Sequence, residues 1–180
     1  MRGIPINQEM LEGNACFGCS LTNHHGLQIR IYRDGDRDDR LVGEYSPRGS
    51  QQSLPGIVHG GIQFTVLDCM AGWIVFGLRA DERKMPITLN AKIRYRKPAR
   101  LYEAMTLAAE VVSMEITGEG PKRKEIITIH AETRDLENDI LSEADFSYMA
   151  MPESQFCQVV GIAELSEPYR KHFAAAEVPG

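Results

Sequence analysis

The stretch from residue 62 to residue 78 constrains the fold more than any other part of the chain. Its apolar residues surround the helix axis instead of keeping to one stripe, which is typical of a helix in the middle of a core. Gly60 and Gly61 precede it, so the sequence predicts a glycine turn that leads into a buried helix. Asp68 is the exception, because an ionised carboxylate is disfavoured in an apolar core unless it is paired or faces a polar cleft. Asp68 is therefore either a satisfied structural group or a functional one.

The start of this helix carries no Ser, Thr, Asp or Asn cap, since His59 stands before the two glycines. Uncapped N–H groups at the positive end of a helix form a site for an anion or a polarised carbonyl oxygen. His59 and Asp68 are separated by about 13 Å of helix rise and by roughly half a turn beyond whole turns. They cannot meet over one small reacting group within one chain. If both ends act on one substrate, a second chain must supply the other half.

The bulk composition indicates one globular domain. The chain has 180 residues, of which 43% are hydrophobic and 25% charged, which is ordinary for a folded protein with a sizeable core. The net charge of -5 gives no overall field that would attract nucleic acid. We therefore expect no nucleic-acid partner.

Two observations favour a cytoplasmic location. The segment 1–6 has no apolar run long enough for a signal peptide, and four cysteines without such a signal indicate thiols in a reducing compartment, without disulfides. The stretch 60–78 is barely long enough to cross a membrane and contains Gln63 and Asp68. We expect a core helix there and no membrane span.

A Cys-x-x-Cys motif lies near the N-terminus, in Cys16-Phe17-Gly18-Cys19. Three interpretations are open: a metal site that adds His24 or His25, a redox pair, or a tight turn with partly buried thiols. The sequence has no second such motif, since Cys69 lies in the predicted core helix and Cys157 in the tail after residue 152. The turn is favoured, so we expect no metal site.

Alternating apolar and polar residues predict strands around the helix. Segments 26–33 and 41–45 flank a charged Asp-Gly turn at 34–39 and indicate a hairpin with a solvated loop. Further strands are expected after the helix, at residues 87–96, 104–114, 124–134 and 140–149. Residues 1–15 are expected to form an exposed or loosely packed lead-in, and a short helix is expected around 163–176. The sum is an α+β fold in which about six antiparallel strands curl around one helix.

The strand at 87–96 shows the clearest alternation. Strict period two places Ile87, Leu89, Ala91, Ile93 and Tyr95 on one face. The opposite face then holds Thr88, Asn90, Lys92, Arg94 and Arg96.

Three motifs together resemble a known family. Pro55-Gly56-Ile57-Val58-His59-Gly60-Gly61, with an aspartate nine positions after the His, is similar to the hotdog-fold acyl-CoA thioesterases, specifically the phenylacetate-pathway type of the 4-hydroxybenzoyl-CoA thioesterase superfamily. The stretch from Thr88 to Pro98 is similar to the family's strand after the helix. Cys16 and Cys19, with Asn23 and Gly26-Leu27, resemble a lead-in in one branch of that family. The resemblance covers about residues 16–150.

The resemblance implies a hotdog fold and a division of the chain into a lead-in at 1–25, a thioesterase domain at 26–150 and a tail at 151–180. It also implies a homo-oligomer, dimer or tetramer, with active sites between subunits. There the Gly60 amide of one chain would face Asp68 and Thr88 of another. The implied reaction hydrolyses an acyl-CoA thioester to free acid and coenzyme A, with no cofactor besides the coenzyme A of the substrate.

Thioester hydrolysis gives each candidate residue a role. Asp68 would act as general base or nucleophile, and Gly60 N–H would polarise the carbonyl. His59 is expected mainly to brace the turn, and Thr88 to hold water or the thioester. The candidates for substrate binding are Gly61, Asn90, Ser53 and Arg96; Ser53 stands where family members often carry Asn. The competing hypothesis is a non-catalytic hotdog protein that binds acyl-CoA or a protein partner.

Overall fold

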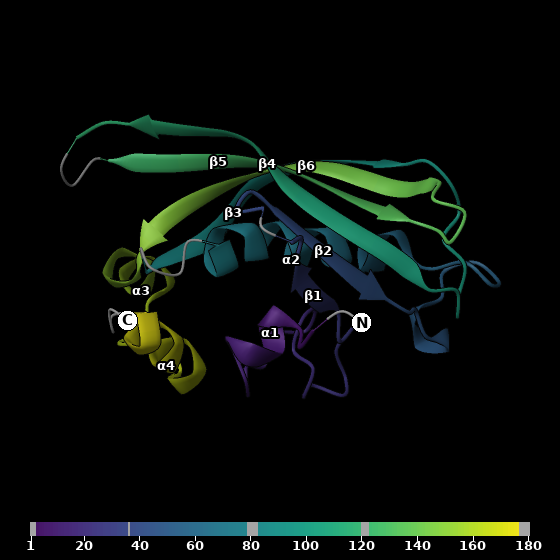
Figure 1. Ribbon diagram of the computed structural model, residues 1–180, viewed down its shortest axis with the longest axis horizontal. Helices are drawn as coiled ribbons and strands as arrows, with labels where there is room; N and C mark the ends of the chain where they lie inside the picture. The colour runs from purple at the N-terminus through teal and green to yellow at the C-terminus, as the bar shows by residue number, and fades with distance from the viewer. Residues whose placement is uncertain (1–2, 36, 79–82, 120–122, 177–180) are drawn as a thin grey trace.

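A six-stranded antiparallel sheet curves over one long helix in this protein (Figure 1). The computed structural model describes residues 3–35, 37–78, 83–119 and 123–176. The long helix is α2 (Gly60–Leu78). The strands, in their order across the sheet, are β1 (Arg30–Arg33), β2 (Arg40–Tyr45), β4 (Met105–Thr117), β5 (Lys124–Arg134), β6 (Ile140–Pro152) and β3 (Lys84–Tyr95). The predicted α+β hotdog architecture is confirmed.

Helix α2 is apolar all round because it is covered from both sides. The sheet packs on one side, and the segments near the two termini lie on the other (Figure 1). Phe76 of α2 packs edge-on against Tyr169, with ring centroids 5.6 Å apart, and Gly77 lies close to Ile6. The stretch Gly60–Gly77 has the length and mean hydropathy, 1.3, of a membrane span, but 56% of it is buried within the protein. It is the core helix of this fold.

The expectation of an exposed or loosely packed lead-in at 1–15 holds only in part: residues 1–2 lie outside the described residues and Ile4 is exposed, but the segment that follows is anchored to the core. It forms a short helix, α1 (Ile6–Glu9), in which Ile6 is buried. The side chain of Asn7 is also buried and donates to the carbonyl oxygens of Cys19, at 2.6 Å, and Ile29, at 2.8 Å. Its own Oδ1 accepts the N–H of Ile31 at 3.1 Å. One amide side chain thus fixes the lead-in to the start of β1, since buried polar groups are stable only when hydrogen-bonded.

The tail forms two helices where one was expected. Helix α3 (Glu153–Val160) ends at Gly161, whose φ of 72° is the left-handed conformation that favours glycine after a helix. Helix α4 (Glu167–Ala176) begins one residue before Pro168 and packs on Phe76 through Phe173. A short 3₁₀ helix, η1 (Gly49–Gln51), precedes the loop that leads into α2.

A β-bulge in β3 corrects the predicted assignment of its two faces. Thr88 pairs with Tyr148 of β6, but the next pair is Asn90 with Ser147, so Leu89 is an extra residue. The bulge shifts the alternation by one residue. Thr88 therefore lies on the helix-facing side of β3, together with Ala91, Ile93 and Tyr95. The residues of β6 that pair with these four are all buried. Ile87 lies on the outer side, opposite Met149.

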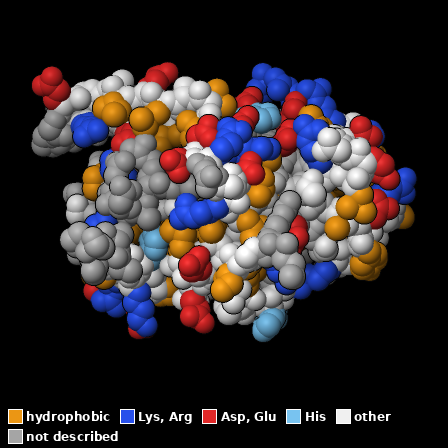
Figure 2. Space-filling model, viewed as in Figure 1, with side chains coloured by type: hydrophobic (Ala, Val, Ile, Leu, Met, Phe, Trp, Pro, Cys, Tyr) orange, Lys and Arg blue, Asp and Glu red, His pale blue; other side chains and the backbone are white. Residues whose placement is uncertain are grey.

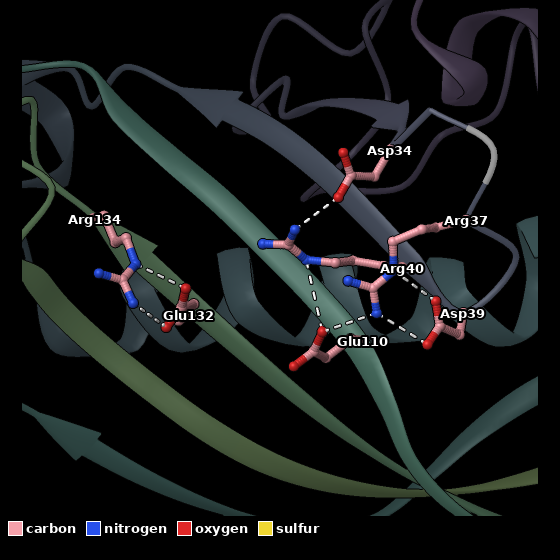
Figure 3. A network of polar contacts seen from close by, with 7 residues as sticks. All are labelled: Asp34, Arg37, Asp39, Arg40, Glu110, Glu132 and Arg134. Carbon is pink, nitrogen blue, oxygen red and sulfur yellow. Dashed lines mark hydrogen bonds and ion pairs between the residues drawn. The ribbon is translucent and has the colours of Figure 1, made fainter.

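The charged loop between β1 and β2 is bound to the sheet by ion pairs (Figure 3). Arg40 contacts Asp34 at 2.7 Å and Glu110 of β4 at 3.7 Å. Arg37 contacts Asp39 at 2.9 Å and Glu110 at 3.4 Å. All five side chains are partly exposed, so each pair contributes little to stability and their main effect is to orient the loop.

Candidate active site

Asp68 lies at the boundary between helix and sheet and is held by two hydroxyl groups. The Thr88 hydroxyl donates to Oδ1 of Asp68 at 3.1 Å. The Tyr148 hydroxyl lies 2.7 Å from the same Oδ1 and 2.8 Å from the backbone oxygen of Asp68. The bulge at Leu89 turns Thr88 toward the helix, so both hydroxyls come from adjacent strands and converge on one carboxylate oxygen.

Tyr148 is a donor in this arrangement. Its side chain is almost completely buried, and burial together with the neighbouring Asp68 carboxylate raises the pKa of Tyr148 well above its usual value. The hydroxyl therefore keeps its proton and donates a hydrogen bond to Asp68. Nothing in the sequence indicated that Tyr148 would contact Asp68.

The second carboxylate oxygen of Asp68, Oδ2, has no hydrogen-bond partner in the described part of the chain. Asp68 lines a mainly apolar cavity of about 270 Å³. The other lining residues are Leu11, Cys16, Cys19, Cys69, Gly72, Trp73, Phe76, Met85, Pro86, Thr88, Tyr148, Phe156 and Tyr169. The carboxylate thus has one oxygen fixed by hydroxyls and one available to a molecule in an aromatic-lined cavity.

The N-terminus of α2 forms the second half of the site. Nδ1 of His59 accepts the N–H of Gly61 at 2.9 Å, so His59 caps the helix with its ring. This agrees with the expected bracing role and means that the Gly61 N–H is already occupied. The N–H of Gly60 has no acceptor among the described residues, and it is the donor left for a ligand oxygen.

Tyr95 links this helix end to β3. Its hydroxyl donates to the backbone oxygen of Gly60 at 3.0 Å. A Cβ atom at Gly60 would lie 3.1 Å from the Tyr95 hydroxyl oxygen and 3.2 Å from the ring, so this close approach requires glycine or a small shift of the ring. Both ends of the candidate site therefore contact β3: Gly60 through Tyr95 and Asp68 through Thr88.

The remaining predicted binding residues, Ser53, Asn90 and Arg96, are not among the residues that line the cavity beside Asp68. Ser53 is exposed in the loop before α2, where its N–H bonds the oxygen of Ile57 at 2.9 Å. Asn90 lies on the outer face of the sheet, opposite Ser147. Arg96 follows the end of β3 and its Nε donates to Glu143 at 3.0 Å.

The sequence of the site region matches one family model. Residues 55–116, which include α2 and β3, match the model described as the thioesterase superfamily. Over these residues, about a third of the chain, the sequence is similar to the thioesterase superfamily. This match agrees with the predicted enzyme class, a thioester hydrolase. No curated protein matches the chain at the level of sequence.

Solved structures of thioesterases share the fold. A hypothetical thioesterase from Streptococcus pneumoniae TIGR4, solved with coenzyme A, is 22% identical, with 69% of this chain and 86% of that chain covered and a TM-score of 0.55. A thioesterase from Haemophilus influenzae is 18% identical, with 74% and 84% covered and a TM-score of 0.58. A phenylacetic acid degradation-related putative thioesterase from Ralstonia eutropha JMP134 is 17% identical, with 68% and 85% covered and a TM-score of 0.56.

The two halves of the candidate site offer complementary chemistry. The free N–H at the positive helix end can bind a carbonyl oxygen, and Oδ2 of Asp68 can accept a proton or attack a carbonyl carbon. Both lie on one helix, eight residues apart, which is about 12 Å of rise. The separation is too large for one thioester carbonyl to contact both groups of the same chain.

Proposed function

We propose that this protein hydrolyses acyl-CoA thioesters to the free acid and coenzyme A at sites formed between two copies of the chain. The observation that carries this proposal is the Asp68 carboxylate, with Oδ1 held by Thr88 and Tyr148 and Oδ2 bonded to no group among the described residues. A carboxylate oriented in this way beside an apolar cavity suits a reacting group better than a structural one, which would have both oxygens satisfied.

The proposed reaction needs only Asp68, Gly60 N–H and water. As a general base, Oδ2 takes a proton from water while the hydroxide adds to the thioester carbonyl carbon. The carbonyl oxygen becomes negative and accepts the Gly60 N–H, and collapse of this intermediate releases coenzyme A thiolate. As a nucleophile, Oδ2 would itself attack the carbonyl carbon and displace coenzyme A thiolate, and water would then cleave the resulting mixed anhydride to the free acid and the Asp68 carboxylate. In both routes Thr88 and Tyr148 hold Asp68, and no cofactor besides the coenzyme A of the substrate is required.

Strand β3 provides the surface through which two chains would meet. It borders the sheet beyond β6, and its outer edge has no strand partner in the part of the chain described. The strand has 12 residues, and Leu89 and Tyr95 on it are 47% and 51% exposed. A long, exposed, partly apolar edge strand favours pairing with another chain. We therefore propose a homodimer in which two β3 strands pair antiparallel.

This pairing would complete the site. Suppose that the two-fold axis of the dimer passes near Lys92. Because Leu89 is an extra residue in the bulge, Thr88 of one chain then lies opposite Tyr95 of the other. Because Thr88 contacts Asp68 and Tyr95 contacts Gly60, the Gly60 N–H of one chain then approaches Asp68 of its partner. A second row of exposed apolar side chains, Val112, Met114 and Ile116 on β4, offers a surface for a tetramer.

The cavity and the structural neighbours support the proposed substrate class. The aromatic and aliphatic lining beside Asp68 suits an apolar acyl group, and the phenylacetate-type resemblance, with the related Ralstonia eutropha structure, makes aryl acyl-CoA a leading candidate. The Streptococcus pneumoniae thioesterase with coenzyme A supports binding of that carrier.

Arg96 and the basic residues near it would contact the phosphates of coenzyme A, although Glu143 already pairs with Arg96. Figure 2 shows Lys and Arg side chains interspersed with Asp and Glu along the upper, sheet side of the molecule. We propose a cytoplasmic enzyme, where acyl-CoA esters are available.

Replacement of Asp68 by Asn tests the function. The amide keeps the shape but can neither attack a thioester nor accept a proton from water, so hydrolysis should fall by at least about a hundredfold while acyl-CoA binding persists. Asp145→Asn is the matched control, because Asp145 lies on the outer face of β6 beside His130. The assay uses short, medium, long and aryl acyl-CoA thioesters. A wild type that binds these esters without hydrolysing any of them would favour the non-catalytic alternative.

A further inference from the structure

Three cysteines that are far apart in the sequence converge beside the cavity. The Sγ atoms of Cys16, Cys19 and Cys69 all lie within 4.8 Å of one another. Cys16 and Cys19 belong to the lead-in turn, whereas Cys69 follows Asp68 on α2. The metal site considered from the sequence would have used His24 or His25, but both are exposed and neither belongs to this cluster. The third thiol comes from the core helix instead.

The spacing of the sulfur atoms fits a shared metal ion. Two thiolates bound at about 2.3 Å to a tetrahedral zinc ion are about 3.8 Å apart. The Sγ atoms of Cys16 and Cys69 are 3.9 Å apart. A disulfide would require these atoms to approach to about 2.05 Å.

The residues around the three thiols leave space for the sulfur atoms and donate hydrogen bonds to them. A Cβ atom at Gly18 would lie 2.1 Å from Sγ of Cys69, so only glycine in the Cys-x-x-Cys turn leaves room for this third sulfur. The indole N–H of Trp73 donates to Sγ of Cys19 at 3.2 Å, and the backbone N–H groups of Gly18 and Cys19 donate to Cys16. Hydrogen bonds of this kind orient thiolates at metal sites.

We propose that Cys16, Cys19 and Cys69 bind one Zn²⁺ ion per chain. Three thiolates are soft ligands that suit Zn²⁺, and they leave one tetrahedral position for water or another small ligand. Charge favours a divalent over a monovalent soft ion. No Lys or Arg is among the described residues that line the cavity, and three thiolates leave a single negative charge around Zn²⁺ but two around Cu⁺. The ion would attach the lead-in to α2 at the residue after Asp68.

Zinc stoichiometry in the purified full chain tests this proposal, with reductant present throughout. After removal of metal by a chelator and reloading with zinc sulfate, native mass spectrometry should find one ion per chain in the wild type and in Cys157→Ser. Cys157 is buried outside the cluster and is the matched control. Cys16→Ser and Cys69→Ser should lose the ion at the same zinc concentration, and zinc should raise the melting temperature only of the variants that bind it.

A thiol-protection measurement keeps the test independent of how the serine variants fold. In Cys157→Ser, zinc should protect all three remaining thiols from alkylation, and Co²⁺ in its place should give a sulfur-to-metal charge-transfer band. Absence of bound zinc in the wild type would overturn the proposal. Retention of zinc by a folded Cys69→Ser variant would also overturn it, as would a Cys16–Cys69 disulfide that persists under reductant.

Discussion

The Tyr148 hydroxyl lies 2.7 Å from Oδ1 of Asp68 and joins the sheet to the one carboxylate of the core helix. Because Tyr148 comes from β6, the position of Asp68 depends on the packing of the sheet on the helix and not on the helix alone. Thr88 adds a second hydroxyl from the neighbouring strand. The proposed role of Asp68 therefore includes a role for each of these two positioning residues.

Tyr148→Phe should keep the fold and reduce kcat by about tenfold or more, because the ring is retained while a hydrogen bond to a charged group is lost. KM should change less than kcat, since the hydroxyl acts on Asp68 and not on the acyl group. Steady-state kinetics with the preferred acyl-CoA ester measure both constants. Thr88→Val, which keeps the shape of Thr88, should act in the same direction. An unchanged kcat in folded Tyr148→Phe would show that this hydroxyl does not position Asp68 for catalysis.

Gly18→Ala should destabilise the protein by about 1–3 kcal/mol, the usual cost of overpacking, because the new Cβ meets the sulfur of Cys69 at 2.1 Å. Denaturant unfolding measured without zinc isolates this packing effect. Adding Cys69→Ala to the same chain removes the sulfur and should restore most of the loss. If the double variant loses the sum of the two single effects, Gly18 and Cys69 are not coupled and the predicted clash does not occur.

His172 should make the protein less stable in mild acid. Burial lowers the pKa of His172 below its usual value, and its Nε2 is buried without a partner in the described structure. As the pH falls below about 6.5, the unfolded chain binds a proton that the folded protein does not, so folding stability decreases.

His172→Phe should therefore be more stable than the wild type near pH 6 and show a weaker pH dependence between about pH 5 and 7. The phenyl ring can replace the imidazole against Phe76, whose centroid lies 4.8 Å from it. Unfolding curves measured across this range provide the comparison. Parallel pH profiles for the two proteins would show that His172 does not cause the acid sensitivity.

The sequence predicts the architecture well where one pattern dominates. The apolar surround of α2 and the alternation along β5 predict those elements to within two residues. The alternation of apolar and polar residues along β3 could not reveal the bulge at Leu89, since one extra residue in a strand leaves no trace in the local composition. The residues of β3 before Asn90 were therefore assigned to the wrong faces. Thr88 was nevertheless among the candidate site residues, because of the family resemblance.

Long-range contacts are the part of the site that the sequence could not supply. Asp68 and the helix N-terminus stand out because a charge and a glycine turn are anomalous beside an apolar run. Tyr148 and Cys69 look like ordinary core residues, and their roles appear only when the sheet and the lead-in are packed on α2. The packing of the lead-in was missed for the same reason, because the buried Asn7 side chain bonds backbone groups more than ten residues away.

The interface site can be tested by removing one group from each half. Gly60→Pro removes the N–H of Gly60 at the first helical position, where proline is well tolerated, and Gly60→Ala is the control that adds a Cβ but keeps the N–H. Gly60→Pro and Asp68→Asn should each be inactive as pure, folded proteins. In a heterodimer of the two, one site would contain both changes and the other would contain neither.

Activity after mixing these two variants is the most direct measurement. The proteins are unfolded together, refolded in equal amounts, and assayed with the preferred acyl-CoA ester beside each variant refolded alone. Random pairing into dimers with sites shared between chains should restore about a quarter of wild-type activity. If the mixture contains heterodimers by native mass spectrometry but remains as inactive as the separate variants, Gly60 and Asp68 do not act across the interface.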